Sequence, residues 1–134
     1  MSNTTISEPA LTAAVDVLQR CEAVGAAYLL GSAAAGRMRG DSDVDVAILP
    51  SRSTGFTVEQ RLALTAELAR LFGRPVDLGV LSTANVVYAK EAVVHGRILF
   101  ERSHHVTSRF AMLVLSMYAS LQEARREVLR TYAA

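Results

Sequence analysis

The chain has 134 residues, of which 51% are hydrophobic and 20% are charged, and its formal net charge is +1. This composition favours a single domain over residues 1–134, and the balanced charge excludes the strong positive field that drives direct nucleic-acid binding. The lone Cys21 excludes an internal disulfide and no apolar run approaches the roughly 20 residues that span a bilayer, so we expect a cytoplasmic protein with no membrane partner.

The first half of the chain predicts alternating helices and strands. Ser7 precedes a stretch with helical spacing of apolar residues, and Gly31 ends a short apolar run that is typical of a buried strand. The next strand alternates apolar residues with Asp43 and Asp45, which places both aspartates on one face. The predicted elements are a helix over about 7–21, a strand over 26–30, a short helix over 32–35 and a strand over 43–49.

The second half continues the same alternation and predicts an α/β layer structure. Strand 97–101 is expected to turn Ile98 and Phe100 inward. We place the core at about residues 7–102. The predicted elements are a helix that ends at Gly73, a strand over 75–81, a helix over about 83–94, a strand over 97–101 and a final helix over about 106–132.

The Gly31-Ser32 pair follows the first predicted strand and could form an anion site. Glycine has no side chain, so a phosphate can approach its backbone closely, and the N–H groups at the start of a helix attract negative charge. Ser32 adds a hydroxyl group. The pair is also ordinary turn composition, and a purely structural turn is the alternative interpretation.

Asp43 and Asp45 project to one side of their strand, roughly 6.5 to 7 Å apart along the chain. Two unpaired carboxylates on a largely apolar strand repel each other unless a cation compensates them. Hard oxygen ligands without neighbouring His or Cys favour magnesium or manganese over zinc. The alternative is that both aspartates lie at a solvated strand edge.

Asp77 adds a third carboxylate on an independent strand, whose other face is apolar. If the two strands are neighbours, the three carboxylates converge and suit a site for two ions roughly 3.5 to 4 Å apart. Asp77 would then hold the second ion and help to deprotonate an acceptor hydroxyl. Asp77 could equally mark a strand end.

One motif joins these features: Gly31-Ser32, ten intervening residues, and then Asp43-Val44-Asp45. It resembles the GSx10DxD signature of the DNA polymerase beta-like nucleotidyltransferase superfamily, and in particular its stand-alone minimal members. The agreement extends to Gly36-Arg37, to Ser42 and to the strand that carries Asp77, and it covers nearly the whole chain. The resemblance implies a small mixed β-sheet flanked by helices, with a long C-terminal helix.

Members of this family bind a magnesium nucleotide, transfer a nucleoside monophosphate to a hydroxyl group and release pyrophosphate. For Arg37 and Ser42, a solvated turn cation and a simple turn hydroxyl remain the alternatives. The family alone implies ATP as the nucleotide. The resemblance implies three groups of site residues: Asp43, Asp45 and Asp77 as catalytic ligands of two Mg²⁺ ions, Gly31 and Ser32 as contacts of the β- and γ-phosphates, and Arg37 and Ser42 as supporting nucleotide contacts.

Little chain remains after about Glu101 for an acceptor-binding domain, so the acceptor surface is small or comes from another molecule. The final helix carries a wide apolar stripe that could meet a partner, or could lie in a groove of its own domain. Minimal nucleotidyltransferases resemble the antitoxins of HEPN/MNT toxin–antitoxin systems, which transfer AMP from ATP to a tyrosine of a HEPN ribonuclease toxin. The stripe residues that we expect to contact such a toxin are Phe110, Leu113, Val114 and Met117.

Two alternatives stay open at this stage. Nucleotidyl transfer to a small hydroxylated molecule, such as an aminoglycoside, would need a pocket that this chain has little length to build. A non-catalytic antitoxin that masks its partner would retain the fold without turnover. Replacement of Asp43 and Asp45 by Asn would separate masking from catalysis.

Overall fold

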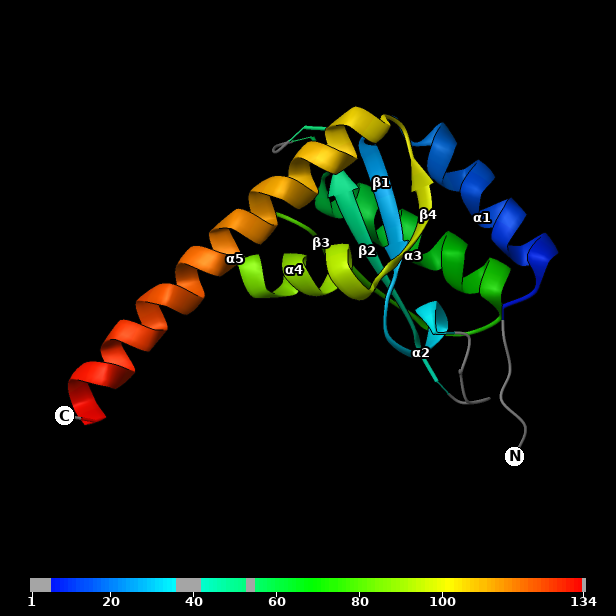
Figure 1. The fold of residues 1–134 in the computed structure, drawn as a ribbon. Coiled ribbons are helices and arrows are strands. Elements are labelled where there is room, and N and C mark those ends of the chain that lie inside the picture. Colours follow the sequence, from blue (N-terminus) through cyan, green and yellow to red (C-terminus); the bar gives the residue numbers. More distant parts are fainter. Residues whose placement is uncertain (1–5, 36–41, 53–54, 134) are drawn as a thin grey trace.

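The sheet lies at the centre of the computed structural model, which describes residues 6–35, 42–52 and 55–133 (Figure 1). Among these residues, four strands pair in the order β3-β2-β1-β4. β1 pairs antiparallel with β2 and β4, whereas β2 and β3 are parallel, so the predicted mixed sheet is confirmed. The strands are β1 (Val24–Leu29), β2 (Val44–Pro50), β3 (Val76–Val80) and β4 (Arg97–Glu101).

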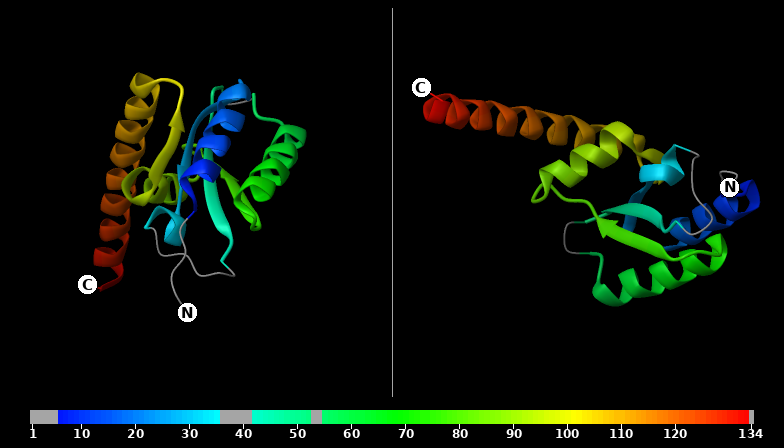
Figure 2. Two further views of the ribbon diagram at one scale, coloured as in Figure 1. Left: turned by 90° about the vertical axis from the view of Figure 1, so that its right-hand side faces the viewer. Right: turned by 90° about the horizontal axis from the view of Figure 1, so that it is seen from below.

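Helices cover both faces of the sheet, α1 and α3 on one side and α4 and α5 on the other (Figure 2). The remaining helix within the described ranges, α2, is a single turn between β1 and β2. This arrangement confirms the α/β layers that the sequence predicts. The helices are α1 (Glu8–Arg20), α2 (Gly31–Ala34), α3 (Val58–Phe72), α4 (Val86–His95) and α5 (His104–Ala133).

The ends of α1 and α3 follow from local side-chain chemistry. The Ser7 hydroxyl accepts a hydrogen bond from a backbone N–H in the first turn of α1. Thr57 and Gln60 form a reciprocal capping box at the start of α3, which satisfies two backbone donors that a helix start leaves unpaired. Gly73 ends α3 with a φ of 66°, a backbone conformation that favours glycine.

The strands β1 and β2 divide the apolar residues between two cores because successive side chains point to opposite faces. Val44, Val46 and Ile48 are fully buried against α1 and α3. Ala47 and Leu49 face α4 and α5. The packing on both faces holds β2 in one register and fixes which side Asp45 occupies.

The long helix α5 corrects one part of the sequence prediction. Val114 is fully buried in the core against α4, so it cannot contact a partner, and Phe110 packs partly against the same core. Leu113 and Met117 remain exposed, at 50% and 38% of their surface. The apolar stripe is wide because α5 packs against its own domain with one apolar side and leaves a second apolar side exposed.

The edge strand β4 also differs from the prediction. Phe100 packs against the core as expected, but Ile98 is 46% exposed. An irregularity in the pairing matches Ala27 with Phe100 and the next residue, Tyr28, with Ile98. The extra residue, Leu99, therefore packs beside Phe100, and the alternation breaks.

No helix in the described part of the chain combines the length and apolar character that crossing a membrane requires.

Candidate active site

The candidate site lies at the edge of the sheet where β1 ends and β2 and β3 begin. Because β1 runs antiparallel to β2, its last residues lie beside the first residues of β2. The backbone N–H of Leu30 donates to the carbonyl oxygen of Asp45 at 2.9 Å. The chain then turns at Gly31, so the Gly31-Ser32 corner and Asp45 are neighbours in space although Gly31 and Ser32 precede Asp45 by 14 and 13 positions in sequence.

Gly31 has a φ of 58°, a region that L-residues rarely occupy. A Cβ atom added there would lie 3.3 Å from Oδ2 of Asp45. The bare glycine backbone therefore lies against that carboxylate, and a larger residue would strain the backbone and crowd the acid. Ser32 follows in the first turn of α2 and is exposed.

Asp45 and Asp77 are direct partners in the parallel register of β2 and β3. Neighbouring strands lie about 4.8 Å apart, and residues paired in register point to the same face. A hydrogen bond of 2.9 Å from the Val44 N–H to the Pro75 carbonyl fixes this register at the start of the pair. Asp43 precedes β2 and is exposed. The two strands thus bring the three predicted carboxylates to one edge.

The acids influence one another electrostatically. Burial raises the pKa of the Asp45 carboxyl above its usual value, and the negative charges of Asp77 and then Asp43 raise it further. Like charges raise the pKa of a neighbouring carboxyl because they disfavour its ionised form. Asp45 is half-buried, whereas Asp43 and Asp77 are exposed.

The donor set suits a hard cation, since carboxylate oxygens are the ligands that magnesium prefers. In the ranges that the structure describes, no three or more His, Cys, Asp or Glu side chains form a ready-made metal cage. Three ionised carboxylates repel each other, so a closed cage is not the expected arrangement of these side chains by themselves. What the fold supplies is the placement of Asp45 and Asp77 as neighbours on one face, with Asp43 directly before β2.

The two supporting residues from the motif have different outcomes. Ser42 is half-buried directly before Asp43, and its carbonyl oxygen accepts from Nη1 of Arg74 at 3.4 Å. Arg74 therefore links the segment before β2 to the end of α3. Arg37 lies outside the described residues.

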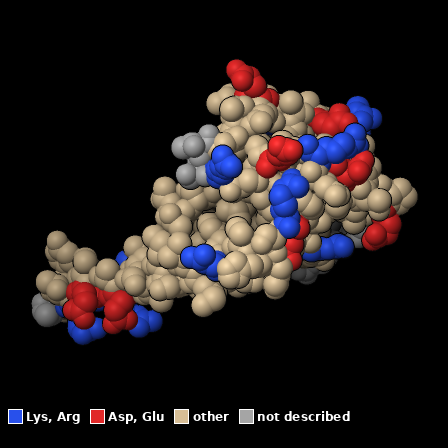
Figure 3. Space-filling view, turned by 90° about the horizontal axis from the view of Figure 1, so that it is seen from above, with Lys and Arg blue, Asp and Glu red and all other residues tan. Residues whose placement is uncertain are grey.

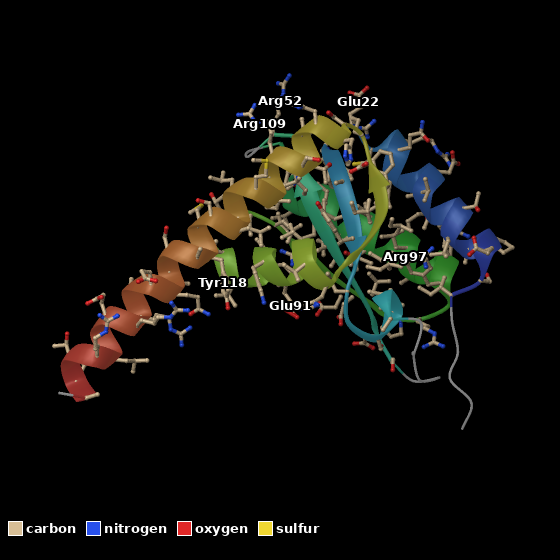
Figure 4. The ribbon with its side chains drawn as sticks, viewed as in Figure 1. Glu22, Arg52, Glu91, Arg97, Arg109 and Tyr118 are labelled. Atoms are coloured by element: carbon tan, nitrogen blue, oxygen red, sulfur yellow. The ribbon has the colours of Figure 1, made fainter. Side chains whose placement is uncertain are left out.

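Helix α4 crosses the sheet above the acidic edge and forms a wall that sequence reasoning did not foresee. A cavity of about 260 Å³ lies between α4 and the Gly31 corner. Two polar residues of α4 line this cavity: Glu91, which Figure 4 labels, and His95. The cavity is lined by Leu30, Gly31, Ala34, Ala35, Glu91 and His95.

Tyr88, also on α4, was missed because its contact depends on how α4 crosses the sheet. Its side chain lies over Gly79, which shares the face of Asp77 two residues away. Burial raises the pKa of the Tyr88 hydroxyl, and the charges of Asp77 and Asp45 raise it further, while Arg61 opposes them. The signal in the sequence was Gly79, which follows Asp77 on the same face of β3 and has no side chain.

A small mixed sheet with a Gly-Ser corner against an acidic strand pair is the arrangement that the resemblance to nucleotidyltransferases implies. The family model described as Polymerase beta, Nucleotidyltransferase matches residues 13–105, and the chain belongs to this family. The protein adenylyltransferase MntA of Shewanella oneidensis is 30% identical over 102 residues, which are 76% of this chain and 71% of MntA.

Solved structures support the same assignment of fold. A mutant MntA–HpeT toxin–antitoxin crystal structure superposes with a TM-score of 0.76 and 25% identity, over 92% of this chain and 98% of that one. A toxin–antitoxin crystal structure with AMP-PNP gives a TM-score of 0.72 and 27% identity, over 91% of this chain and 98% of that one. The match over nearly the full length includes the long C-terminal helix.

Proposed function

We propose that this chain is an antitoxin that transfers AMP from ATP to a tyrosine hydroxyl of a partner HEPN ribonuclease toxin. The observation that carries the proposal is the Gly31 corner packed against the acidic pair Asp45 and Asp77. The similarity to a protein adenylyltransferase and to a toxin–antitoxin complex with AMP-PNP supports the reaction, the nucleotide and the type of partner.

The triphosphate binds at the corner in this proposal. The exposed backbone of Gly31 and the hydroxyl of Ser32 contact the β- and γ-phosphates, because glycine permits close approach and Ser32 opens a helical turn. Ser42 and Arg37 add nucleotide contacts from the segment that leads into β2. The nucleoside then extends towards the cavity below α4.

The carboxylates Asp43, Asp45 and Asp77 would hold two magnesium ions. Magnesium bound there would neutralise triphosphate charge and favour in-line displacement at the α-phosphorus. The oxygen of the acceptor tyrosine forms the new bond to that phosphorus as the bond to pyrophosphate breaks. Asp77 lies at the outer strand of the pair, and its carboxylate helps to take the proton that the acceptor loses.

The toxin docks on the uncovered side of α5 in this proposal. Leu113 lines an apolar cavity of about 410 Å³ on this helix, and Met117 lies one turn further along. The surface along the first half of α5 carries few charges, which gather instead near α1 and at the tip of α5 (Figure 3). Exposed apolar surface of this kind is typical of a protein interface. The cavity is lined by Val106, Arg109, Phe110, Met112 and Leu113.

We further propose that residues 1–134 act as one catalytic domain and that the protein works in the cytoplasm. ATP is available there, and the free thiol of Cys21 stays reduced.

The test incubates the purified chain with magnesium, ATP labelled at the α-phosphate and the HEPN protein of the neighbouring gene. We expect label on the HEPN protein and loss of its ribonuclease activity. Asp43→Asn with Asp45→Asn should abolish labelling, whereas Asp16→Asn, the same chemical change on the exposed side of α1, should not.

Absence of label with wild-type protein would overturn the proposal. If the double variant silences the toxin as well as wild type does, without labelling it, the chain masks its partner instead.

A further inference from the structure

The acidic face of β3 has one position without a side chain, and α4 fills it. Gly79 lies two residues after Asp77, so both residues face the same side of the sheet. A Cβ atom added at Gly79 would overlap the hydroxyl of Tyr88 and would lie 2.7 Å from Cζ of its ring. The Tyr88 hydroxyl therefore rests on the sheet, in the row next to Asp77.

Local structure in α4 determines this placement. Asn85 caps the helix, and its side-chain oxygen accepts from the backbone N–H of Tyr88 at 3.4 Å. Ala89 and Ala92 are fully buried, and these small side chains let α4 lie close to the sheet. Because the helix lies this close, the long side chain of Tyr88 extends along the sheet towards β3, where a larger residue than Gly79 would block it.

Among the described residues, the Tyr88 hydroxyl donates to no protein group, although the ring is half-buried and packs against the core between the sheet and helices α4 and α5. The hydroxyl lies over Gly79, which shares one face of β3 with Asp77.

Arg61 limits the acceptors that this hydroxyl can reach. Its Nη2 and Nε atoms donate to the Leu78 carbonyl at 2.6 and 3.1 Å, so this main-chain oxygen between Asp77 and Gly79 already has donors. The neighbouring side-chain acceptor on this face of β3 is the Asp77 carboxylate, two residues before Gly79. A neutral donor beside an anion forms a stronger hydrogen bond than it would to a neutral acceptor.

We propose that Tyr88 is a positioning residue for Asp77: in the assembled site its hydroxyl, which makes no such bond in this structure, donates a hydrogen bond to this carboxylate and orients it towards the acceptor hydroxyl. The inference rests on the proposed function, because it assigns Tyr88 to the acceptor side of the same site. Tyr88 takes no part in bond making and acts only through Asp77. Gly79 contributes to this placement because it leaves room for the phenol ring of Tyr88.

The first test is Tyr88→Phe, which keeps the ring over Gly79 and removes only the donor. We expect kcat for AMP transfer to fall about 10-fold or more, in line with the loss of one hydrogen bond to a charged group, with KM for ATP within about 2-fold. Tyr28→Phe is the matched control, since Tyr28 is a buried tyrosine beside Glu101 rather than beside the aspartates. Its kcat should change by less than about 2-fold.

The second test needs no activity. Gly79→Ala should lower the melting temperature, because the new Cβ displaces the Tyr88 side chain. In a Tyr88→Ala background the same change should lower the melting temperature much less. This difference would show that the two positions are coupled. Equal costs in both backgrounds would show that Tyr88 does not occupy this space, and would overturn the inference.

The outcomes separate the two proposals. If wild type labels its partner and Tyr88→Phe retains the full kcat, the positioning role is wrong while the proposed function stands. If wild type transfers no AMP to the partner, the proposed function fails and the positioning role fails with it. A selective fall in kcat together with the stability coupling supports both.

Discussion

The two faces of strand β2 have different roles. On the side of α1 and α3, Val44, Val46 and Ile48 are fully buried and apolar. On the opposite side, the same strand begins with Asp45, whose ionised form is disfavoured by burial and by its acidic neighbours. Alternation along one strand thus joins a stabilising apolar face to a face on which Asp45 opposes folding, and the apolar packing of the strand offsets that cost.

The largest difference between the faces should appear in catalysis. Asp43→Asn with Asp45→Asn removes two carboxylates without changing the volume of the side chains. We expect the rate of AMP transfer, measured with labelled ATP, to fall about 10³-fold or more because the charge stabilisation of the transferring phosphate is lost. The melting temperature should not fall. If the rate of AMP transfer by this variant stays within 10-fold of wild type, the assignment of these aspartates to catalysis is wrong.

The apolar face should respond in stability instead. Leu68 on α3 is fully buried, and Leu68→Ala should lower the free energy of unfolding by about 2–5 kcal/mol through lost burial and a cavity. Urea denaturation measures this loss. Leu62→Ala is the control on the same helix, since Leu62 is 66% exposed, and should change stability by less than about 0.5 kcal/mol. Equal losses would contradict the described packing of α3.

A smaller effect on the same side concerns the start of α3. Thr57→Ala removes the capping box with Gln60 and leaves helix N–H groups without a partner. The expected loss is about 1 kcal/mol in the free energy of unfolding, again by urea denaturation. Thr57→Ser keeps the hydroxyl and should restore most of the stability. Identical behaviour of the two variants would exclude the cap as the cause.

The smallest effect concerns the pH dependence of stability. The folded-state pKa of Asp45 is raised, so the folded protein binds this proton more tightly than the unfolded chain does. Stability should therefore decline as pH rises through that raised pKa, and the decline should be absent in Asp45→Asn. At neutral pH we expect this variant to melt ~2 °C above wild type. A variant that melts below wild type would contradict the repulsion between the acids.

Much of this contrast was predictable from local pattern. The spacing between Gly31-Ser32 and Asp43-Val44-Asp45 indicates the family, and period-two alternation predicts which side Asp45 and Asp77 share. The fold class follows from alternating helices and strands, and the structure confirms it. These features are local, or depend only on two strands being neighbours.

The remaining features depend on tertiary contacts that no local pattern encodes. The apolar stripe of α5 is so wide that the sequence does not show which side of it, the side of Val114, packs against the domain. Ile98 is exposed because of a pairing irregularity at an edge strand, which period-two alternation cannot foresee. Tyr88 reaches the acidic face only because α4 lies close across the sheet.

The most direct test of the central claim is the stoichiometry of Mn²⁺ bound in the presence of a non-hydrolysable ATP analogue, measured by titration of wild type and Asp77→Asn. If β2 and β3 share their carboxylates between two ions, wild type should bind two Mn²⁺ ions and the variant one, with the analogue still bound. The same stoichiometry and affinity in both proteins would contradict the claim that Asp77 belongs to the site.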